Sequence, residues 1–516
     1  MSSKKERVYK YIKMALAALF AGFVFAVGKT IDLTDTIYLN DVSMFIKMAV
    51  ITFLSFGIMA AGDLIINKIK SKGVIKVKEL PKWTVIIPLA SWIVSWLAIF
   101  PGVFSYDCYE EWQMVANNSL TSHHPVLHVL MLGGLTNISD KLFGNGNVGI
   151  AVYVGIQIAF YVFVFLRMNA FLKTEKKYLA QWIALVFYTV SPVIMMFVIA
   201  TTKDSIFAAF ELWFIINCLR LERGEKLKDK LFITEFVLSA AGTMIFRKNG
   251  LYIVVLVMIY LLIRYFKSEK RIFVTVAIIA LVYFLYSVPF FAVLNVGKTS
   301  SAEMMAVPIQ QMARVYRFNS ESLTNEDKEV MFEVIPEEYW KLYIPTTVDS
   351  IKNGFDNDAY ARRKVEFYKV WIKQGLKNPM TYVNAFMANT VDFWCPISVN
   401  DGYRWLYAMD SDDKSTFFDY RVAPPGEKIT IIKPIYALIN YLSTEKEVTT
   451  GVLSIFLNSG WYILAWLVSV VFTNKRNKKY TFHIIMLLSL LSVLAGPMAL
   501  VRYVLIFYLV LPLEIQ

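Results

Sequence analysis

The sequence predicts an all-helical polytopic integral membrane protein, and three observations support this fold class. Of the 516 residues, 57% are apolar and only 18% are charged, and the mean hydropathy is +0.50. Soluble domains carry roughly 25% charged residues and about 45–50% apolar ones. Long apolar stretches recur along the chain, and Lys and Arg gather between alternate stretches. A water-soluble enzyme, a disordered chain and a fibrous protein are therefore excluded.

About twelve apolar stretches approach the roughly 20 residues that a helix needs to cross a bilayer. The first follows a basic N-terminus, as in a signal peptide, but no small-residue cleavage site follows it, so we expect a retained helix. The twelve stretches lie near residues 12–28, 45–66, 83–100, 147–167, 178–199, 204–219, 231–246, 250–266, 272–295, 449–472, 481–499 and 501–514.

The charge distribution predicts an orientation. Every second loop is rich in Lys and Arg, which places these loops and both termini in the cytoplasm. The longest polar stretch, 297–448, instead has 18 Lys and Arg against 21 Asp and Glu, a net charge of −3. The total of +13 therefore leaves +16 on the rest of the chain. The basic excess is explained by the cytoplasmic rim of a membrane protein, without nucleic acid as a partner.

This topology divides the chain into four predicted parts. Residues 1–82 hold two N-terminal transmembrane helices and a basic cytoplasmic loop. Residues 83–296 form a transmembrane module whose first outer loop spans 101–146. Residues 297–448 form a mostly helical extracytoplasmic segment, and residues 449–516 form C-terminal transmembrane helices. Juxtamembrane helices are expected on the outer face.

The first outer loop concentrates titratable side chains. Asp107 and Glu111 are four residues apart, so a helix would place both carboxylates on one face. Such a pair can hold a divalent cation or act as a general base. The alternative is a solvated loop without chemistry. The titratable residues of this loop are Asp107, Glu110, Glu111, His123, His124 and His128.

The histidines allow two interpretations. His124 and His128 have the spacing of metal ligands on a helix, but no H-E-x-x-H motif accompanies them. A role in fixing the loop or contacting a substrate is favoured, because Pro125 suits the start of a helix. We therefore assign Glu110, His123 and His124 to substrate binding.

Cations interrupt the apolar stretches at three other turns predicted to lie outside. A charge within a membrane helix costs roughly 2.5–3.5 kcal/mol on insertion scales. Guanidinium and ammonium groups suit phosphate, so a bound anion would explain these charges. Snorkelling toward lipid headgroups is the alternative. The turns are ATTKDSIF with Lys203 and Asp204, MIFRKNGLY with Arg247, Lys248 and Asn249, and MALVRYVLIF with Arg502 and Tyr503.

Two further features are less specific. Gln310, Gln311 and Arg314 carry amide and guanidinium groups that suit sugar hydroxyls or phosphate, although solvated helix residues would look the same. Cys108 and Cys395 both fall on the predicted outer side, and their pairing is left open because three cysteines cannot form a disulfide scaffold.

An acid after Pro-Gly in the first outer loop, followed some fifteen residues later by His-Pro, resembles the GT-C superfamily of polytopic glycosyltransferases. The motifs PGVFSYD…HHP, TTKDSIFA, FRKNGLY and VPIQQMARVY are most similar to uncharacterised bacterial members. The resemblance implies a GT-C-like fold, a polyprenyl-phosphate-linked sugar donor and inverting transfer. It also implies that Asp107 is the catalytic base or a metal ligand. The loop lacks the tandem acids of several members, so a divalent cation (Mg²⁺ or Mn²⁺) is left open.

The resulting hypothesis is a membrane glycosyltransferase that moves a sugar to an envelope glycan, lipid or protein acceptor on the outer face of the cell membrane. Asp107 and Glu111 would be catalytic, with Asp107 also the candidate metal ligand. A polysaccharide polymerase or ligase is the nearest alternative. A flippase or transporter of lipid-linked glycans is a different class, and a sensor or structural membrane protein would leave the outer cations unexplained.

Overall fold

The computed structural model describes residues 2–71, 77–104, 107–398, 426, 429–444, 452–473 and 479–515. Residues 399–425 of the predicted extracytoplasmic segment lie outside this range, as do 72–76 and 474–478 of two predicted basic loops. The described chain is helical, with isolated β-bridges and no named strand. This confirms the predicted all-helical class.

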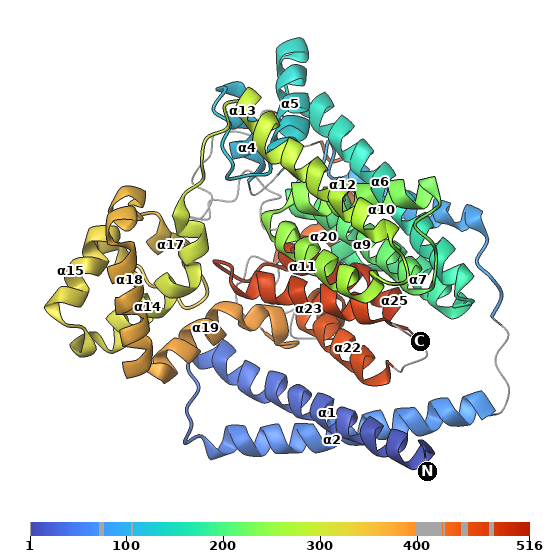
Figure 1. Ribbon diagram of the computed structural model, residues 1–516, viewed down its shortest axis with the longest axis horizontal. Coiled ribbons are helices and arrows are strands. Elements are labelled where there is room, and N and C mark those ends of the chain that lie inside the picture. Colours follow the sequence, from blue (N-terminus) through green and yellow to red (C-terminus); the bar gives the residue numbers. More distant parts are fainter. Residues whose placement is uncertain are drawn as a thin grey trace.

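Long helices make up the body of the molecule (Figure 1). In chain order they are α1 (Ser2–Thr34), α2 (Val42–Ser71), η1 (Lys82–Val85), α3 (Ile86–Ala98), α4 (Cys108–Ala116), α5 (Val126–Phe143), α6 (Asn147–Thr174), α7 (Tyr178–Val190), α8 (Pro192–Ile199), α9 (Lys203–Glu222), α10 (Lys230–Phe246), α11 (Lys248–Tyr265), α12 (Arg271–Leu285), η2 (Tyr286–Phe290) and α13 (Phe291–Val293). After an intervening lobe follow α20 (Lys433–Thr444), α21 (Ser454–Leu457), α22 (Ser459–Phe472), α23 (Tyr480–Leu494), η7 (Val501–Val504), α24 (Leu505–Leu509) and α25 (Leu511–Glu514).

Five described helices are long and apolar enough to cross a membrane. They are Glu6–Thr34, Val42–Lys68, Asn147–Thr174, Lys248–Tyr265 and Arg271–Val293. The pair α7 and α8 passes the same test together, although its axis bends by 66° where Ser191 and Pro192 break the helix. Three of the other predicted spans are shorter apolar helices, Lys82–Ala98, Ser459–Val471 and Tyr480–Leu494. A count of twelve spans therefore stays a prediction.

The helix α2 presents apolar side chains to its surroundings. Phe53 is 78% exposed and Ile58 is 72% exposed. Large contiguous apolar surfaces are rare on soluble proteins. Contact with lipid accounts for this surface, because lipid tails are as apolar as these side chains.

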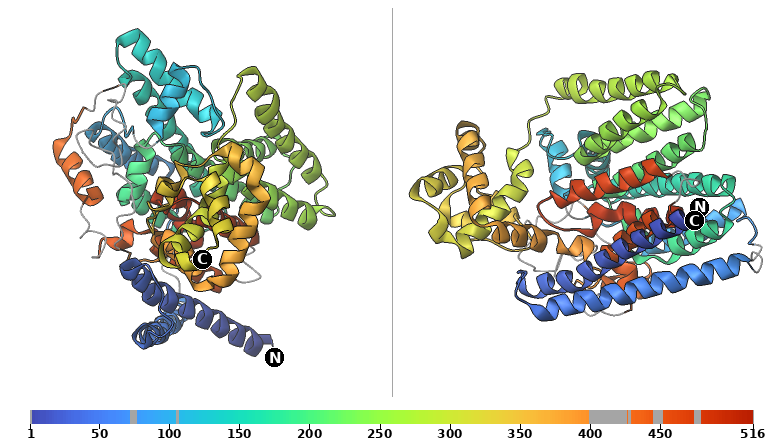
Figure 2. Two further views of the ribbon diagram at one scale, coloured as in Figure 1. Left: turned by 90° about the vertical axis from the view of Figure 1, so that its left-hand side faces the viewer. Right: turned by 60° about the horizontal axis from the view of Figure 1, so that its bottom comes forward.

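A smaller lobe with its own hydrophobic core lies at one end of the long helices (Figure 2, right). Trp340 and Phe367 are fully buried in that core. The helices of the lobe are η3 (Ser301–Met305), α14 (Ala306–Phe318), η4 (Ser320–Ser322), α15 (Asn325–Val334), α16 (Glu337–Trp340), α17 (Asp349–Lys352) and α18 (Asn357–Lys377). The next helix, α19 (Pro379–Trp394), begins in the lobe, and its second half packs in the core of the body.

The lobe is fixed to the body by hydrogen bonds from both ends of the chain. The Arg314 guanidinium donates to the carbonyl of Asp35 and to the hydroxyl of Thr36, both at 2.7 Å. The backbone N–H of Val348 donates to the carbonyl of Pro497 at 3.1 Å, five residues before Arg502. These bonds place η3 and α17 opposite the ends of α9 and α11, where the polar residues of the body gather.

Candidate functional site

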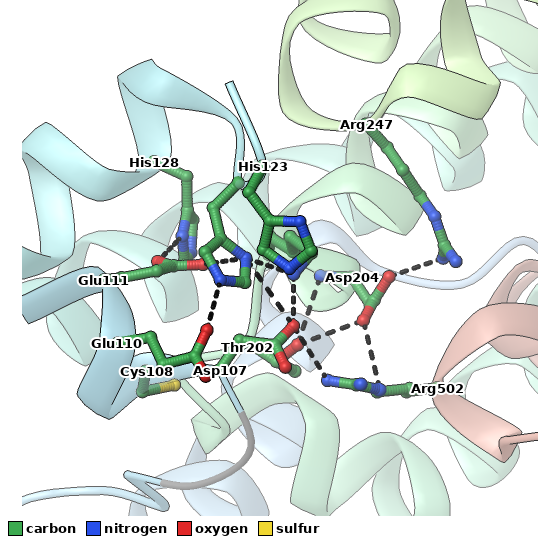
Figure 3. A network of polar contacts seen from close by, with 12 residues as sticks. Asp107, Cys108, Glu110, Glu111, His123, His128, Thr202, Asp204, Arg247 and Arg502 are labelled. Atoms are coloured by element: carbon green, nitrogen blue, oxygen red, sulfur yellow. Dashed lines mark hydrogen bonds and ion pairs between the residues drawn. The ribbon is translucent and has the colours of Figure 1, made fainter. Parts of the chain in front are cut away.

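The titratable residues from distant parts of the sequence meet at one place (Figure 3). The first turn of α4, the loop before α5, the N-terminus of α9, the junction of α10 with α11, and η7 each contribute side chains. The network comprises Asp107, Glu110, Glu111, His123, His124, His128, Lys203, Asp204, Arg247 and Arg502. The structure brings these residues together, and their place on the outer side of the membrane stays a prediction.

Local sequence explains why Lys203 stands where it does. Thr202 caps α9 by accepting a hydrogen bond from the Asp204 N–H, and Asp204 suits the positive end of the helix dipole. Lys203, at the first helical position, faces the same dipole unfavourably. An acidic neighbour is needed to offset this charge, and Asp107 supplies it.

Asp107 is held by two cations. Its Oδ2 atom accepts a hydrogen bond from Lys203 Nζ and lies 3.5 Å from Arg502 Nη1. Burial raises the pKa of the Asp107 carboxyl, but Lys203 and Arg502 outweigh burial and hold that pKa well below its usual value. The carboxylate is therefore ionised, and it is a weak base while both cations stay in place.

Asp204 joins the two arginines. It is completely buried, with Arg247 Nη1 2.5 Å from Oδ1 and Arg502 Nε 3.5 Å from Oδ2. The Arg247 guanidinium also stacks on the Tyr503 ring, 4.3 Å from its centroid. A buried carboxylate without these partners would be strongly destabilising. The pairing thus fixes both guanidinium groups in position.

The acids of α4 contact the histidines. Glu110 Oε2 lies 3.1 Å from His124 Nε2, and Lys203 Nζ lies 2.8 Å from His124 Nδ1. Glu111 is buried and bonds His128 Nδ1. Glu111 therefore lies behind the site, whereas Glu110 and His123 line the cavity described below.

A chain of buried hydrogen bonds continues from His128 into the body. His128 Nε2 lies 2.7 Å from the Tyr153 hydroxyl, which donates to Gln157 Oε1 at 3.3 Å. The Gln157 amide donates to the carbonyls of Phe197, Val198 and Ala200, at 3.2, 2.9 and 2.8 Å. These carbonyls end α8, so Gln157 fixes the short connection that leads to Lys203.

The first loop is fastened to the same connection. The N–H of Val103 donates to the carbonyl of Ile199, and the N–H of Thr201 donates to the carbonyl of Val103. Gly102 has a φ of +143°, and a Cβ there would lie 2.6 Å from a Val154 methyl group. Glycine is required by this close approach and by the backbone conformation.

A cavity of about 880 Å³ opens beside the network. One part of its lining is cationic, with Lys203, Arg247, Lys248 and Arg502. Within the described chain, the Lys248 side chain makes no hydrogen bond or ion pair. Asn249 donates weakly to Ser492 on α23.

The remaining lining has two other characters. Between α11 and α23 it is apolar, with Tyr252, Ile253, Leu256, Leu488, Leu491 and Val493. The lobe supplies a polar wall with Thr299, Ser300, Ser301, Glu303, Asp349 and Lys352. This lobe wall could not be predicted from the sequence, because no local pattern indicates that α17 lies near the end of α11.

Three predicted substrate contacts lie elsewhere. Gln310 donates to the carbonyls of Ile344 and Pro345, and Gln311 bonds Tyr382 and Trp371, all within the lobe. Arg314 holds the lobe to the body. None of Gln310, Gln311 and Arg314 is among the residues that line the cavity. Cys108 and Cys395 are buried and are not joined in a disulfide.

The surroundings of Asp107 do not fit the divalent cation considered from the sequence. Mg²⁺ and Mn²⁺ prefer several oxygen ligands, and Mg²⁺ demands near-octahedral geometry. At Asp107 the Lys203 ammonium already occupies the side of Oδ2, and Arg502 adds a second positive charge. Fixed cations of the chain provide the positive charge that an ion would bring.

We predict that Gln157→Leu loosens the connection to α9. The substitution leaves the carbonyls of Phe197, Val198 and Ala200 without their shared donor, at a cost of about 1–3 kcal/mol for a buried group left unsatisfied. The apparent melting temperature of the purified protein in detergent should fall by several degrees. Gln113→Leu is the control, because among the described residues the Gln113 side chain bonds only Tyr109 and Asn117, on α4 and at its C-terminal end. Equal melting temperatures for both variants would contradict this role.

Comparison with known proteins adds a family assignment. No curated protein and no solved structure matches the chain. Residues 116–416, more than half of the chain, match a family described as a family of unknown function (DUF6020). This range contains the three histidines of the first loop, Lys203, Asp204, Arg247 and the lobe, whereas Asp107 and Arg502 lie outside it. The chain therefore belongs to this family of unknown function.

Proposed function

We propose that the protein is a membrane glycosyltransferase that takes a sugar from a polyprenyl-phosphate-linked donor. The acceptor would be a hydroxyl of a cell-envelope glycan, lipid or protein. The observation that carries this proposal is the double character of the cavity, cationic at one part and apolar between α11 and α23. A ligand with one phosphate and a long apolar chain matches both parts.

The cations of the cavity are the proposed binding site for the donor phosphate. Arg247 and Arg502 are oriented by Asp204, so their guanidinium groups lose little freedom on binding an anion. Lys248 adds a charge without a partner among the described residues. When the sugar leaves, its lipid phosphate gains negative charge, and fixed cations stabilise that charge in the transition state.

Asp107 is the proposed base, and its activation is coupled to the donor. Lys203 and Arg502 are shared between Asp107 and the cavity. A phosphate in the cavity competes for both cations. As they turn toward the phosphate, the pKa of Asp107 rises and the carboxylate becomes a better acceptor for the proton of the attacking hydroxyl. The hydroxyl oxygen then bonds to the anomeric carbon as the phosphate departs, with inversion.

The architecture of the proposal is a GT-C-like fold with its active site on the outer face of the membrane and both termini in the cytoplasm. The five candidate spans and the bent pair α7–α8 supply part of the twelve spans. The shorter apolar helices α3, α22 and α23, together with α9, α10 and α24–α25, would supply the rest. Glu111 takes a positioning role in this proposal, since it is buried against His128.

We predict that Asp107→Asn abolishes transfer and spares donor binding. Loss of a general base lowers the rate by about 10²–10⁴-fold, whereas removal of a carboxylate near the cations leaves them free for phosphate. The measurement is release of polyprenyl phosphate from short-chain polyprenyl-phosphate hexoses and pentoses, with binding followed separately. Asp358→Asn, an exposed position on α18, is the matched control. If Asp107→Asn transfers sugar at the full rate, Asp107 is not the base. If the reconstituted wild-type protein takes up or flips the lipid without transferring sugar, a transporter is favoured.

We also predict that Lys203→Met moves the acidic limb of the kcat/KM profile toward higher pH. The Lys203 cation lowers the pKa of Asp107, so its removal raises that pKa. Because the reaction needs ionised Asp107, activity then falls at a higher pH during acidification. The acidic limb should move upward by about one pH unit or more.

Lys248→Met provides the control for this profile. Lys248 lines the cavity and makes no bond to Asp107. Its loss should raise KM without moving the acidic limb. If both variants keep the limb of the wild-type protein, the coupling between Lys203 and Asp107 is wrong.

A further inference from the structure

Three potential metal ligands meet at the rim of the cavity. Glu110, His123 and His124 each direct one ligand atom to a common place, and these atoms lie within 4.8 Å of one another. The imidazole rings of the two histidines meet edge to face, with centroids 4.5 Å apart. Both Glu110 and His123 face the cavity, whereas His124 is buried behind them.

The protonation of His124 follows from its neighbours. Lys203 is a donor only, so His124 Nδ1 accepts its hydrogen bond at 2.8 Å. The ring proton is therefore on Nε2, which donates to Glu110 Oε2 at 3.1 Å. A proton thus joins the two side chains where a cation could join them instead.

We propose that Glu110, His123 and His124 form a binding site for a transition-metal ion of the zinc class. Two imidazoles and one carboxylate are the donor set of zinc sites that keep one position open. The same set suits Mg²⁺ and Ca²⁺ poorly, because these ions prefer oxygen ligands throughout. The site is distinct from Asp107, whose carboxylate is held by Lys203 and Arg502.

Metal binding requires a rearrangement behind the triad. With metal on Nε2, the proton of His124 lies on Nδ1, so Lys203 Nζ, now 2.8 Å from Nδ1, has to turn away and keep its bond to Asp107 alone. Glu111 Oε1 at 3.6 Å and Asp107 Oδ2 at 3.8 Å are the nearest carboxylate oxygens, and a small approach by either would let it accept that proton. A carboxylate behind a metal-bound histidine fixes the ring and raises its basicity.

The open position of the ion faces the cavity. Glu110 and His123 belong to the lining, so a ligand in the cavity can reach the metal directly. Oxygen donors are the class expected there, namely water, a phosphate oxygen or a hydroxyl. Metal binding itself is independent of the sugar-transfer proposal, because it needs only residues of the first loop.

The test is metal binding by the purified full-length protein in detergent, stripped with a chelator and without any lipid donor. Titration with Zn²⁺ against a chelating dye should give one tight site per chain, and Co²⁺ should give the visible absorption of a four- or five-coordinate ion. His123→Ala and Glu110→Gln should each weaken Zn²⁺ binding at least tenfold. Glu110 is exposed, so its conservative replacement leaves the fold intact.

His483→Gln is the matched control, since His483 is the chain's histidine outside the first loop and bonds Thr473. This variant should bind Zn²⁺ as the wild-type protein does. The proposal would be overturned if the wild-type protein had no tight Zn²⁺ site, or if His123→Ala and Glu110→Gln bound Zn²⁺ with wild-type affinity. Displacement of Zn²⁺ by equimolar Mg²⁺ would also overturn it. If the wild-type protein binds Zn²⁺ at this site but transfers no sugar, the proposed function is wrong and the metal site is still supported.

Discussion

Two carboxylates, Asp107 and Asp204, hold three cations that come from separate helices. Lys203 begins α9, Arg247 links α10 to α11, and Arg502 lies in η7 near the end of the chain. Each cation alone would be costly beside apolar helices. Their pairing removes that cost and draws the first loop, α9, α11 and η7 together at one place. The position of the cavity depends on this network.

The same network explains the reactivity that we propose for the site. Asp204 is buried between its arginines, so it acts as a fixed counter-charge. Asp107 is partly exposed and shares its cations with the cavity, so its basicity depends on what the cavity holds. One carboxylate thus positions the cations, while the other responds to them. In the proposed function, the apolar lining between α11 and α23 holds the hydrocarbon chain of the lipid-linked donor.

Charges that contradict their apolar surroundings are the residues of the sequence that the structure brings together. Lys203, Arg247 and Arg502 interrupt apolar stretches on the side predicted for Asp107, and the structure brings all four together. The precise pairs could not be predicted, because Lys203 and Asp107 are separated by 96 positions in the sequence. Composition also predicted the helical class. The number of spans was harder to predict, since Ser191-Pro192 bends one stretch and α22 and α23 are short.

Amide and guanidinium groups were weaker predictors. Gln310 and Arg314 suit sugar or phosphate chemically, yet the same donors satisfy carbonyls within the lobe and between the lobe and the body. Gln157, by contrast, lies within an apolar stretch and gave no signal, although it fixes three carbonyls before Lys203. Long-range packing decides which polar group faces a cavity, and local sequence does not contain that information.

If the cationic part of the cavity recognises the phosphate of a lipid, the protein should distinguish a short-chain polyprenyl phosphate from the uncharged polyprenol of equal length. Equilibrium binding of both ligands is measured with the wild-type protein and with Arg502→Gln. We expect the wild-type protein to bind the phosphate at least about 100-fold more tightly than the alcohol, or roughly 2.7 kcal/mol, and Arg502→Gln to lose most of this preference. Equal binding of phosphate and alcohol by the wild-type protein would contradict it.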